Sequence, residues 1–117
     1  MAIDYARLQA VAIRLITENG KAGTIVRATR SGPPHAPVIT ETTYACRLVE
    51  TDNKATNWPD SLIQIGDRMG LVSPDVAVTL DRLSDRIVID GVRLSLVELM
   101  ALNPGGTLML YKFLARV

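Results

Sequence analysis

The chain has 117 residues, 48% of them apolar, and its 13 basic and 12 acidic residues give a formal net charge of +1. This length fits one domain with a real core, and the balance of charge argues against a dedicated nucleic-acid binder, which needs a strongly positive face. Cys46 is the only cysteine, so an intrachain disulfide and a thiolate metal cluster are excluded and a reducing, intracellular setting is expected. With no signal-peptide pattern and no apolar run of about 20 residues, the chain is expected to be soluble and to stay outside membranes.

Residues 4–19 are predicted to form one amphipathic helix. Asp4 is a suitable N-cap, and Asn19-Gly20 predicts a left-handed C-terminal stop. A helix of this length cannot bury an apolar stripe by itself, so it must pack against another element. The stripe consists of residues at helical spacing: Leu8, Val11, Ala12, Leu15 and Ile16.

The next part of the chain predicts two strands and two loops. Thr24–Thr29 is rich in β-branched residues. Val38–Glu50 places alternate residues, among them Tyr44, Cys46 and Leu48, on one face of a strand. Between these strands, Ser31–Pro37 contains a glycine and three prolines, which predicts an exposed, extended loop. Thr51–Asp60 is polar and has no periodicity, so we expect a long, mobile loop there.

Two hairpins and a closing strand are predicted in the second half. Gly66-Asp67 joins the first pair of strands and Asp90-Gly91, a strong two-residue turn signal, joins the second. Residues 73–84 are irregular. The apolar phase slips by one residue after Leu96, which indicates a β-bulge, and residues 103–106 turn the chain into the last strand. The strands are predicted at Ser61–Ile65, Arg68–Val72, Arg86–Ile89, Val92–Leu96 and Thr107–Val117.

The predicted fold is mainly β, in a single domain covering residues 1–117. It is a small antiparallel β-barrel or sandwich over about residues 23–117, with one N-terminal α-helix and a long inter-strand loop. The closing strand is apolar on both faces, and such a strand is covered on both sides. One cover is the core, and the other is either the N-terminal helix or a neighbouring subunit. The two apolar faces are Leu108, Leu110 and Leu114 on one side and Met109, Tyr111 and Phe113 on the other.

The residue types that carry catalysis occur without the partners they need. His35 is the only histidine and lies in the proline-rich loop, where an imidazole is poorly held beside a nucleophile. Cys46 is expected to be a small buried hydrophobe rather than a reactive thiol. Asp81, Asp85 and Asp90 match no calcium loop and are better explained by turns and surface pairing. We therefore predict no enzyme activity, no cofactor and no metal site.

Several stretches of the second half follow one another in an order and spacing typical of one family: Ser61–Arg68, Asp85–Val92, Leu94–Leu99, and Pro104–Tyr111 with Leu114 and Arg116. In these stretches the chain resembles the head-closure, or stopper, proteins of tailed bacteriophages and prophages. The sequence departs from the family pattern at Val92-Arg93-Leu94, where the family has an aromatic residue soon after the turn. Tail-completion and other minor tail components have comparable barrels and remain an alternative.

The resemblance implies a structural, non-catalytic protein of the head–tail connector, located in the virion neck and, during assembly, in the cytoplasm of the bacterial host. Such subunits form a homo-oligomeric ring between the portal or adaptor ring proteins and the tail terminator proteins. The ring encloses DNA without sequence-specific binding and closes the filled head. The isolated chain is expected to be monomeric or weakly associating.

The resemblance also places the long loop, Thr51–Asp60, at the channel or docking surface. Trp58 is the only tryptophan, and tryptophan is concentrated where interfaces gain most of their binding energy. An alternative is that Trp58 folds back on Pro59 and Leu62 and anchors the loop. The predicted interface residues are Asp52, Asn53, Lys54, Asn57, Trp58, Asp60, Tyr111 and Phe113.

A second alternative function is a small β-barrel that binds single-stranded nucleic acid. Such a site needs aromatic and cationic side chains on the same strand face. Tyr44 with Arg47, and Tyr111 with Lys112, come closest, but strand alternation puts the members of each pair on opposite faces.

Overall fold

The computed structural model describes residues 4–117, apart from the side chains of residues 54 and 55, and begins with helix α1, Tyr5–Asn19. Oδ1 of Asp4 accepts a hydrogen bond from the backbone N–H of Arg7 at 3.1 Å and caps the helix, as predicted. The apolar stripe is only partly buried, because α1 lies against β2 only on the side of the helix that carries Ile16. The stripe's outer members, Leu8 and Leu15 among them, are exposed, which corrects the expectation that the whole stripe is covered.

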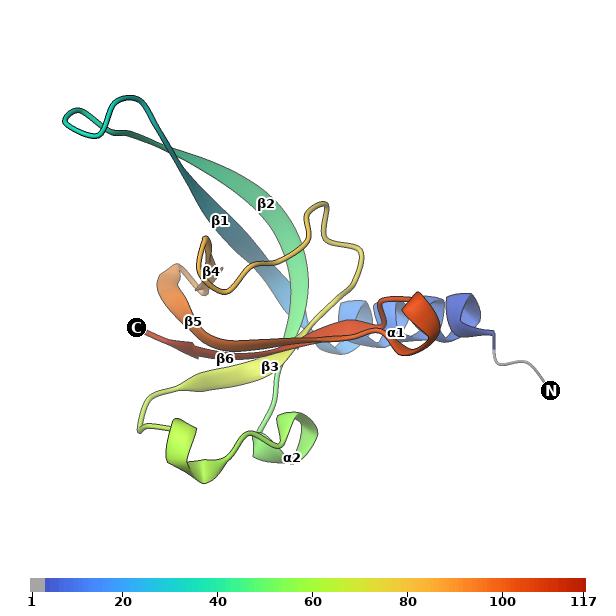
Figure 1. Cartoon of the computed structure of the whole chain (residues 1–117). Helices are drawn as coiled ribbons and strands as arrows, with labels where there is room; N and C mark the ends of the chain where they lie inside the picture. Colours follow the sequence, from blue (N-terminus) through green and yellow to red (C-terminus); the bar gives the residue numbers. More distant parts are fainter. Residues whose placement is uncertain (1–3) are drawn as a thin grey trace.

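Six antiparallel strands close into a barrel in the order β1-β2-β3-β6-β5-β4 (Figure 1). This confirms the prediction of a mainly-β chain with an antiparallel barrel and one N-terminal helix. No helix in the described residues is long and apolar enough to cross a bilayer. The strands are β1 Lys21–Ser31, β2 Val38–Glu50, β3 Arg68–Val72, β4 Asp85–Ile89, β5 Val92–Leu102 and β6 Leu110–Arg116.

The turn and the bulge predicted around β5 are both present. Asp90 and Gly91 have φ values of 54° and 80°, the left-handed pair that a two-residue hairpin turn requires between β4 and β5. Between Leu96 and Glu98 the register with β6 shifts by one residue, so the phase slip seen in the sequence is a β-bulge. The bulge bends β5, which lets it pair with β4 near its start and with β6 along the rest of its length.

The prediction of a strand at Ser61–Ile65 is wrong. A short 3-10 helix, η1 (Asp60–Leu62), follows Pro59, and the chain then turns at Gly66, whose φ is 91°. β3 has no edge to offer a strand at this position, because β2 pairs with one of its sides and β6 with the other. The last strand also begins later than predicted, at Leu110, after the turn of η2 (Pro104–Gly106).

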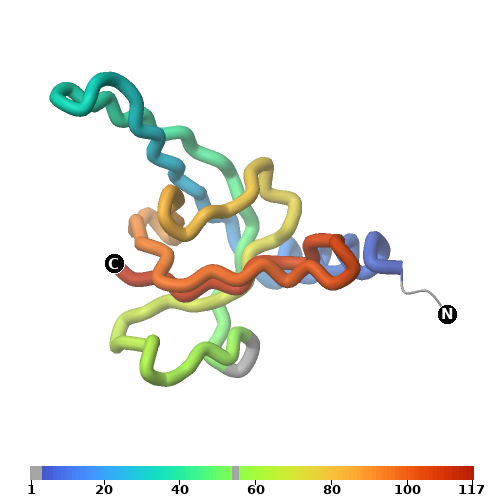
Figure 2. Tube along the Cα trace, in the orientation of Figure 1, coloured from blue at the N-terminus to red at the C-terminus, as the bar shows by residue number. Residues whose placement is uncertain are grey.

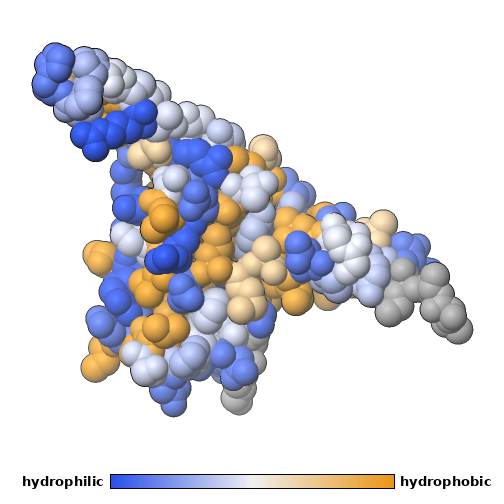
Figure 3. All heavy atoms as spheres, viewed as in Figure 1, coloured by the Kyte–Doolittle hydropathy of each residue, from blue (hydrophilic) through white to orange (hydrophobic). Residues whose placement is uncertain are grey.

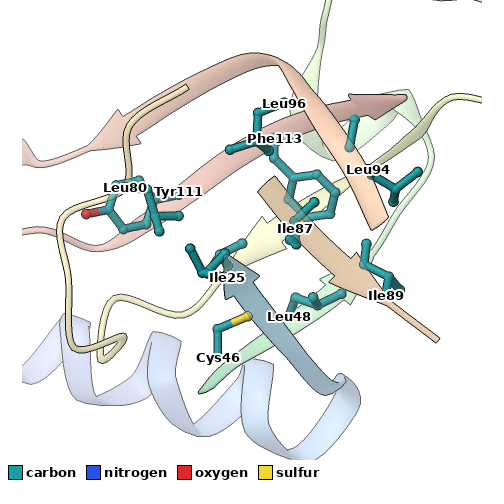
Figure 4. Packing of buried hydrophobic residues seen from close by; sticks show 12 residues of the cluster. Ile25, Cys46, Leu48, Leu80, Ile87, Ile89, Leu94, Leu96, Tyr111 and Phe113 are labelled. Atoms are coloured by element: carbon teal, nitrogen blue, oxygen red, sulfur yellow. The ribbon is translucent and has the colours of Figure 1, made fainter. Parts of the chain in front are cut away.

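The barrel interior is filled mainly by aliphatic side chains, together with the aromatic rings of Phe113 and Tyr111 (Figure 4). Phe113 and Leu48 are fully buried and lie in the same cluster as Cys46 and Tyr111. Burial raises the pKa of the Cys46 thiol to about 11, so the thiol stays protonated at neutral pH. Cys46 is therefore the buried hydrophobe that its position in β2 predicted.

The outer face of β6 is covered by the segment between β2 and β3. Leu114 is fully buried although it lies outside the interior cluster. Trp58, 6% exposed, lies against the same strand and donates a hydrogen bond from Nε1 to the carbonyl of Phe113 at 3.3 Å. The sequence left α1 and a neighbouring subunit as the possible covers of this face. α1 reaches only its beginning, where Nε2 of Gln9 donates to the carbonyl of Leu108 at 2.7 Å.

Candidate functional site: a projecting hairpin and the cleft at its base

The β1–β2 hairpin continues well beyond the barrel. β1 pairs with β4 only over Thr24–Arg27, and β2 pairs with β3 only over Leu48–Glu50. From Ala28 to Thr43 every residue is exposed, and the two strands there pair only with each other. This segment, residues 28–43, is called the arm below. It stands clear of the barrel in Figure 1, and Figure 2 follows the chain to its tip and back.

The tip of the arm is the proline-rich loop, in the exposed position that the sequence predicted. Gly32 takes a φ of 85° at the start of the turn, and the N–H of Ala36 donates to the carbonyl of Pro33 at 3.0 Å. Most of the arm is polar or neutral in hydropathy (Figure 3). Val38 and Ile39 are exceptions, because they are 56% and 66% exposed and stand next to the tip. The arm therefore presents apolar side chains at a place where no core covers them.

A cleft of about 1000 Å³ lies at the base of the arm. Its walls are the base of the arm, the loop of residues 79–84 and the end of β5, where Leu99 and Ala101 line it. Its floor includes Leu80 and Tyr111, which belong to the barrel core. The cleft forms because β4 is short: beyond Asp85, β1 and β5 have no strand between them.

The strongest electrostatic contact at the cleft joins Arg27 to Asp85. Nε and Nη2 of Arg27 donate to the two carboxylate oxygens of Asp85 at 2.8 and 2.9 Å, and Nη2 also donates to the carbonyl of Thr79 at 2.6 Å. The Asp85 side chain is 0% exposed and accepts a further hydrogen bond from the N–H of Asp81 at 2.7 Å. The hydrogen bond with Asp85 raises the pKa of Arg27. This pair ties β1, just below the arm, to β4 and to the loop of residues 79–84.

The three aspartates considered as cation ligands have structural roles. Asp81 accepts from the N–H of Leu83 at 2.9 Å, and this hydrogen bond lowers the pKa of Asp81. Asp85 pairs with Arg27, and Asp90 accepts from Nζ of Lys21 at 2.7 Å. In the described part of the chain, no three His, Cys, Asp or Glu side chains are close enough to hold a metal ion. Turn formation and pairing explain these carboxylates, as the sequence indicated.

The segment predicted to be a mobile loop is organised around Asn53. A short helix, α2 (Asn53–Thr56), begins there, and Oδ1 of Asn53 accepts hydrogen bonds from the N–H of Trp58 at 2.7 Å and from Oγ1 of Thr56 at 3.2 Å. Nδ2 of Asn53 donates to the carbonyl of Trp58 at 2.8 Å. The side-chain amide of Asn53 thus holds this segment together by hydrogen bonds, and the loop that the sequence predicted as irregular contains one short helix.

The predicted interface residues fall into two groups. Asp52, Asn57 and Asp60 are exposed, Asn53 is partly buried, and the side chain of Lys54 is outside the described residues. Trp58, Tyr111 and Phe113 are buried, and the hydrogen bond from Trp58 to the backbone of Phe113 brings two of them together. In this chain the three aromatic side chains are therefore not free for docking. Trp58 anchors the segment through the carbonyl of Phe113 on β6, a partner that the alternative with Pro59 and Leu62 did not include.

A second buried ion pair closes the other end of this segment, and the sequence signalled only a turn there. Nε and Nη2 of Arg116 donate to the two carboxylate oxygens of Asp67, both at 2.8 Å, and Nη2 also reaches the carbonyl of Leu62 at 2.9 Å. The Asp67 side chain is 1% exposed. The hydrogen bond from Arg116 lowers the pKa of Asp67.

Replacement of Arg116 by methionine is expected to make the free energy of unfolding change less as the pH falls from neutral to acidic. In the wild type, the lowered pKa of Asp67 contributes stability above its unfolded value of about 3.9 and loses that contribution as the pH falls through the folded value. In Arg116→Met the buried carboxylate loses its partner, which costs about 2 kcal/mol at neutral pH. At acidic pH Asp67 is protonated in both proteins, so the difference in free energy of unfolding between the wild type and Arg116→Met becomes smaller. Urea unfolding at neutral and at acidic pH measures this difference. An equal difference at both pH values would contradict the assignment.

No protein-family model, no curated protein and no solved structure matches this chain.

Proposed function

We propose that the chain is a non-catalytic structural subunit of the head–tail connector of a tailed bacteriophage or prophage particle. The observation that carries this proposal is the arm. A two-stranded hairpin without a core beneath it is only marginally stable in water, yet residues 28–43 extend from the barrel with Val38 and Ile39 exposed near the tip. In an assembly, neighbouring subunits would cover and stabilise the arm, which explains why a structural protein has it.

The family resemblance supplies the kind of assembly. Of the stretches that resemble head-closure proteins, Asp85–Val92 and Leu94–Leu99 belong to β4, its turn and β5 in the barrel wall. Ser61–Arg68 lies in η1 and the connection to β3, and Pro104–Tyr111 lies in η2 and the start of β6. We propose a homo-oligomeric ring in the virion neck, with portal or adaptor ring proteins on one side and tail terminator proteins on the other. The ring encloses DNA through its shape and does not recognise sequence.

The charges around the cleft favour protein contacts over nucleic-acid binding. Of the three arginines that line the cleft, Arg27 is neutralised by Asp85 and Arg82 lies 3.7 Å from Glu98, so Arg30 is the one without an ion pair among the described residues. Of the aromatic residues near the cleft, Tyr111 is buried in its floor and cannot stack on a base from the surface. A nucleic-acid-binding barrel would instead give the purified chain an affinity for DNA that falls steeply with salt.

Deletion of the gene from the parent particle tests the function. The expected products are DNA-filled heads and free tails that do not join, visible by electron microscopy, because neither partner ring has its docking surface. Tails that still join filled heads in the deletion would refute the connector function.

A shortened hairpin tests whether the arm is needed to join heads and tails in the same particle. Thr29 and Thr40 face each other in the β1–β2 register, so an Asn-Gly turn between them replaces residues 30–39 without changing the pairing below. The shortened chain is expected to fold, since these ten residues are exposed, and to leave heads and tails unjoined. Wild-type particle yields from the shortened chain would show that the arm has no role in joining.

A further inference from the structure

One edge of β2 is unpaired along most of the strand. β3 pairs with β2 only over Leu48–Glu50, and no other described strand lies on that side of β2. The N–H of Ser73 donates to the carbonyl of Arg47 at 2.9 Å, so the backbone N–H and C=O of Arg47 point away from β1. Because these groups alternate along a strand, those of Ile39, Glu41, Thr43 and Ala45 point to the same open side.

β5 has a second unpaired edge, on the wall of the cleft. β4 pairs with β5 only as far as Ser95, and no described strand pairs with this side of β5 from Leu96 to Leu102. The carbonyl of Leu102 accepts from the N–H of Met109, so Leu102 points its backbone groups toward β6. By alternation, Ala101 and Leu99 point theirs into the open cleft. The cleft leaves room for an extended segment along this edge.

Lysine and proline, two common protections against strand addition, are absent from both edges. Residues 38–46 and 96–102 contain neither, and their acidic residues are Glu41 and Glu98. Exposed apolar side chains accompany both edges instead: Val38 and Ile39 on β2, and Met100 and Leu102 on β5. Such edges bind another strand through backbone hydrogen bonds, with the side chains providing selectivity.

We propose that the open edge of β2 in one copy of the chain adds to the open edge of β5 in the next copy. This inference rests on the proposed ring function and names its subunit contact. The two edges differ in sequence and lie on different elements, so the contact is head-to-tail, and head-to-tail contacts close into rings when the rotation permits. The charges near the two edges are complementary, which favours a second copy as the partner. Arg30, opposite Ile39 in the hairpin, makes no ion pair within the described residues. Glu98 lies beside the β5 edge, and its ion-pair partner is Arg82 at 3.7 Å.

Proline substitutions at the two edges test the contact. Thr43→Pro removes an N–H from the open side of β2, and Ala101→Pro removes one from the open side of β5, while the ladders to β1 and β6 keep their donors. The matched controls are Thr43→Ala and Ala101→Ser, which keep the N–H. Sedimentation velocity at concentrations up to about 1 mM, where contacts worth about 4 kcal/mol become populated, measures the association. Melting temperatures establish that each variant is folded, and Ile39→Glu replaces Thr43→Pro if the proline unfolds the hairpin.

The expected result is association of the wild type and both controls, and a loss of association of at least tenfold in each proline variant. A mixture of Thr43→Pro with Ala101→Pro is expected to form dimers and nothing larger. In that mixture only one contact is intact, the β2 edge of Ala101→Pro on the β5 edge of Thr43→Pro. This complementation is the signature of a head-to-tail contact.

Three results would overturn the proposal. Proline variants that associate like the wild type exclude strand addition, and loss in Thr43→Pro alone points to pairing of β2 with β2. A wild type that stays monomeric over the whole concentration range shows that the edge partner is a different protein. None of these results affects the gene-deletion test, so a failure of this contact is distinguishable from a failure of the connector function.

Discussion

Replacement of Arg27 by methionine is expected to lower the free energy of unfolding by about 3 kcal/mol. The Asp85 side chain is 0% exposed, and without the guanidinium it keeps only the N–H of Asp81 among the partners that neutralise or satisfy it. Removal of one member of a buried ion pair costs about 3–5 kcal/mol, because the remaining charge is left without compensation. The lower end applies here because Arg27 is itself 26% exposed. Urea unfolding measures the change.

Two further variants separate loss of the pair from loss of a large side chain. Arg27→Lys keeps the charge but not the two parallel hydrogen bonds, so it is expected to fall between the wild type and Arg27→Met. The double variant Arg27→Met with Asp85→Leu removes the stranded charge and is expected to recover much of the stability. A double variant no more stable than Arg27→Met would show that packing, not the buried carboxylate, causes the loss.

Replacement of Trp58 by alanine is expected to lower the free energy of unfolding by about 3–5 kcal/mol, the range for a large buried aromatic side chain. Trp58 is 6% exposed and donates to the carbonyl of Phe113. The backbone N–H of Trp58 donates to Oδ1 of Asn53 and its carbonyl accepts from Nδ2; alanine keeps both of these hydrogen bonds, so the expected loss comes from the indole alone. Thermal unfolding of the isolated chain measures the effect, and assembly is expected to fall only in step with stability.

Trp58→Phe is the matched control, since it keeps an aromatic ring and removes the indole N–H. Its expected loss is smaller, about 1–3 kcal/mol, including the carbonyl of Phe113 that loses its donor. An unchanged melting temperature in Trp58→Ala together with a sharp loss of head–tail joining would contradict the anchoring role and restore Trp58 as a docking residue.

Elements governed by local chemistry were predictable from the sequence. Asp4 marked the start of α1, Asp90-Gly91 marked the turn between β4 and β5, and the phase slip after Leu96 marked the bulge. Asn19-Gly20 marked the end of α1, but the predicted left-handed stop was wrong, because Gly20 is extended with a φ of −105°. In each case a few neighbouring residues decide the backbone conformation, through a cap, a positive φ or a change of strand face. The barrel followed from the sum of such signals.

Features that depend on distant partners were not predictable in this way. Ser61–Ile65 has the composition of a strand, but β2 and β6 already occupy both sides of β3, its presumed partner. Trp58 lies in a polar segment, and its burial depends on a carbonyl 55 residues away and on one amide side chain. The burial of one side of α1 likewise depends on how much of β2 the helix reaches.

The arm shows the same limit at the candidate site. The prolines of residues 33–37 indicated an exposed loop, and this was correct. Residues 38–43 are β-branched for the most part, a composition equally suited to a barrel strand or to a projecting ribbon. Only the short pairing of β2 with β3 and of β1 with β4 determines where the barrel ends and the arm begins.

The position of the chain in the assembled particle tests the proposed function most directly. Antibodies raised against the purified chain and carrying gold particles can be located on negatively stained particles by electron microscopy. A connector subunit predicts gold at the junction of head and tail, and on tail-free filled heads at the single vertex where the tail would attach. Gold along the tail tube or at the tail tip, or particles that carry no label and contain no such chain by mass spectrometry, would contradict it.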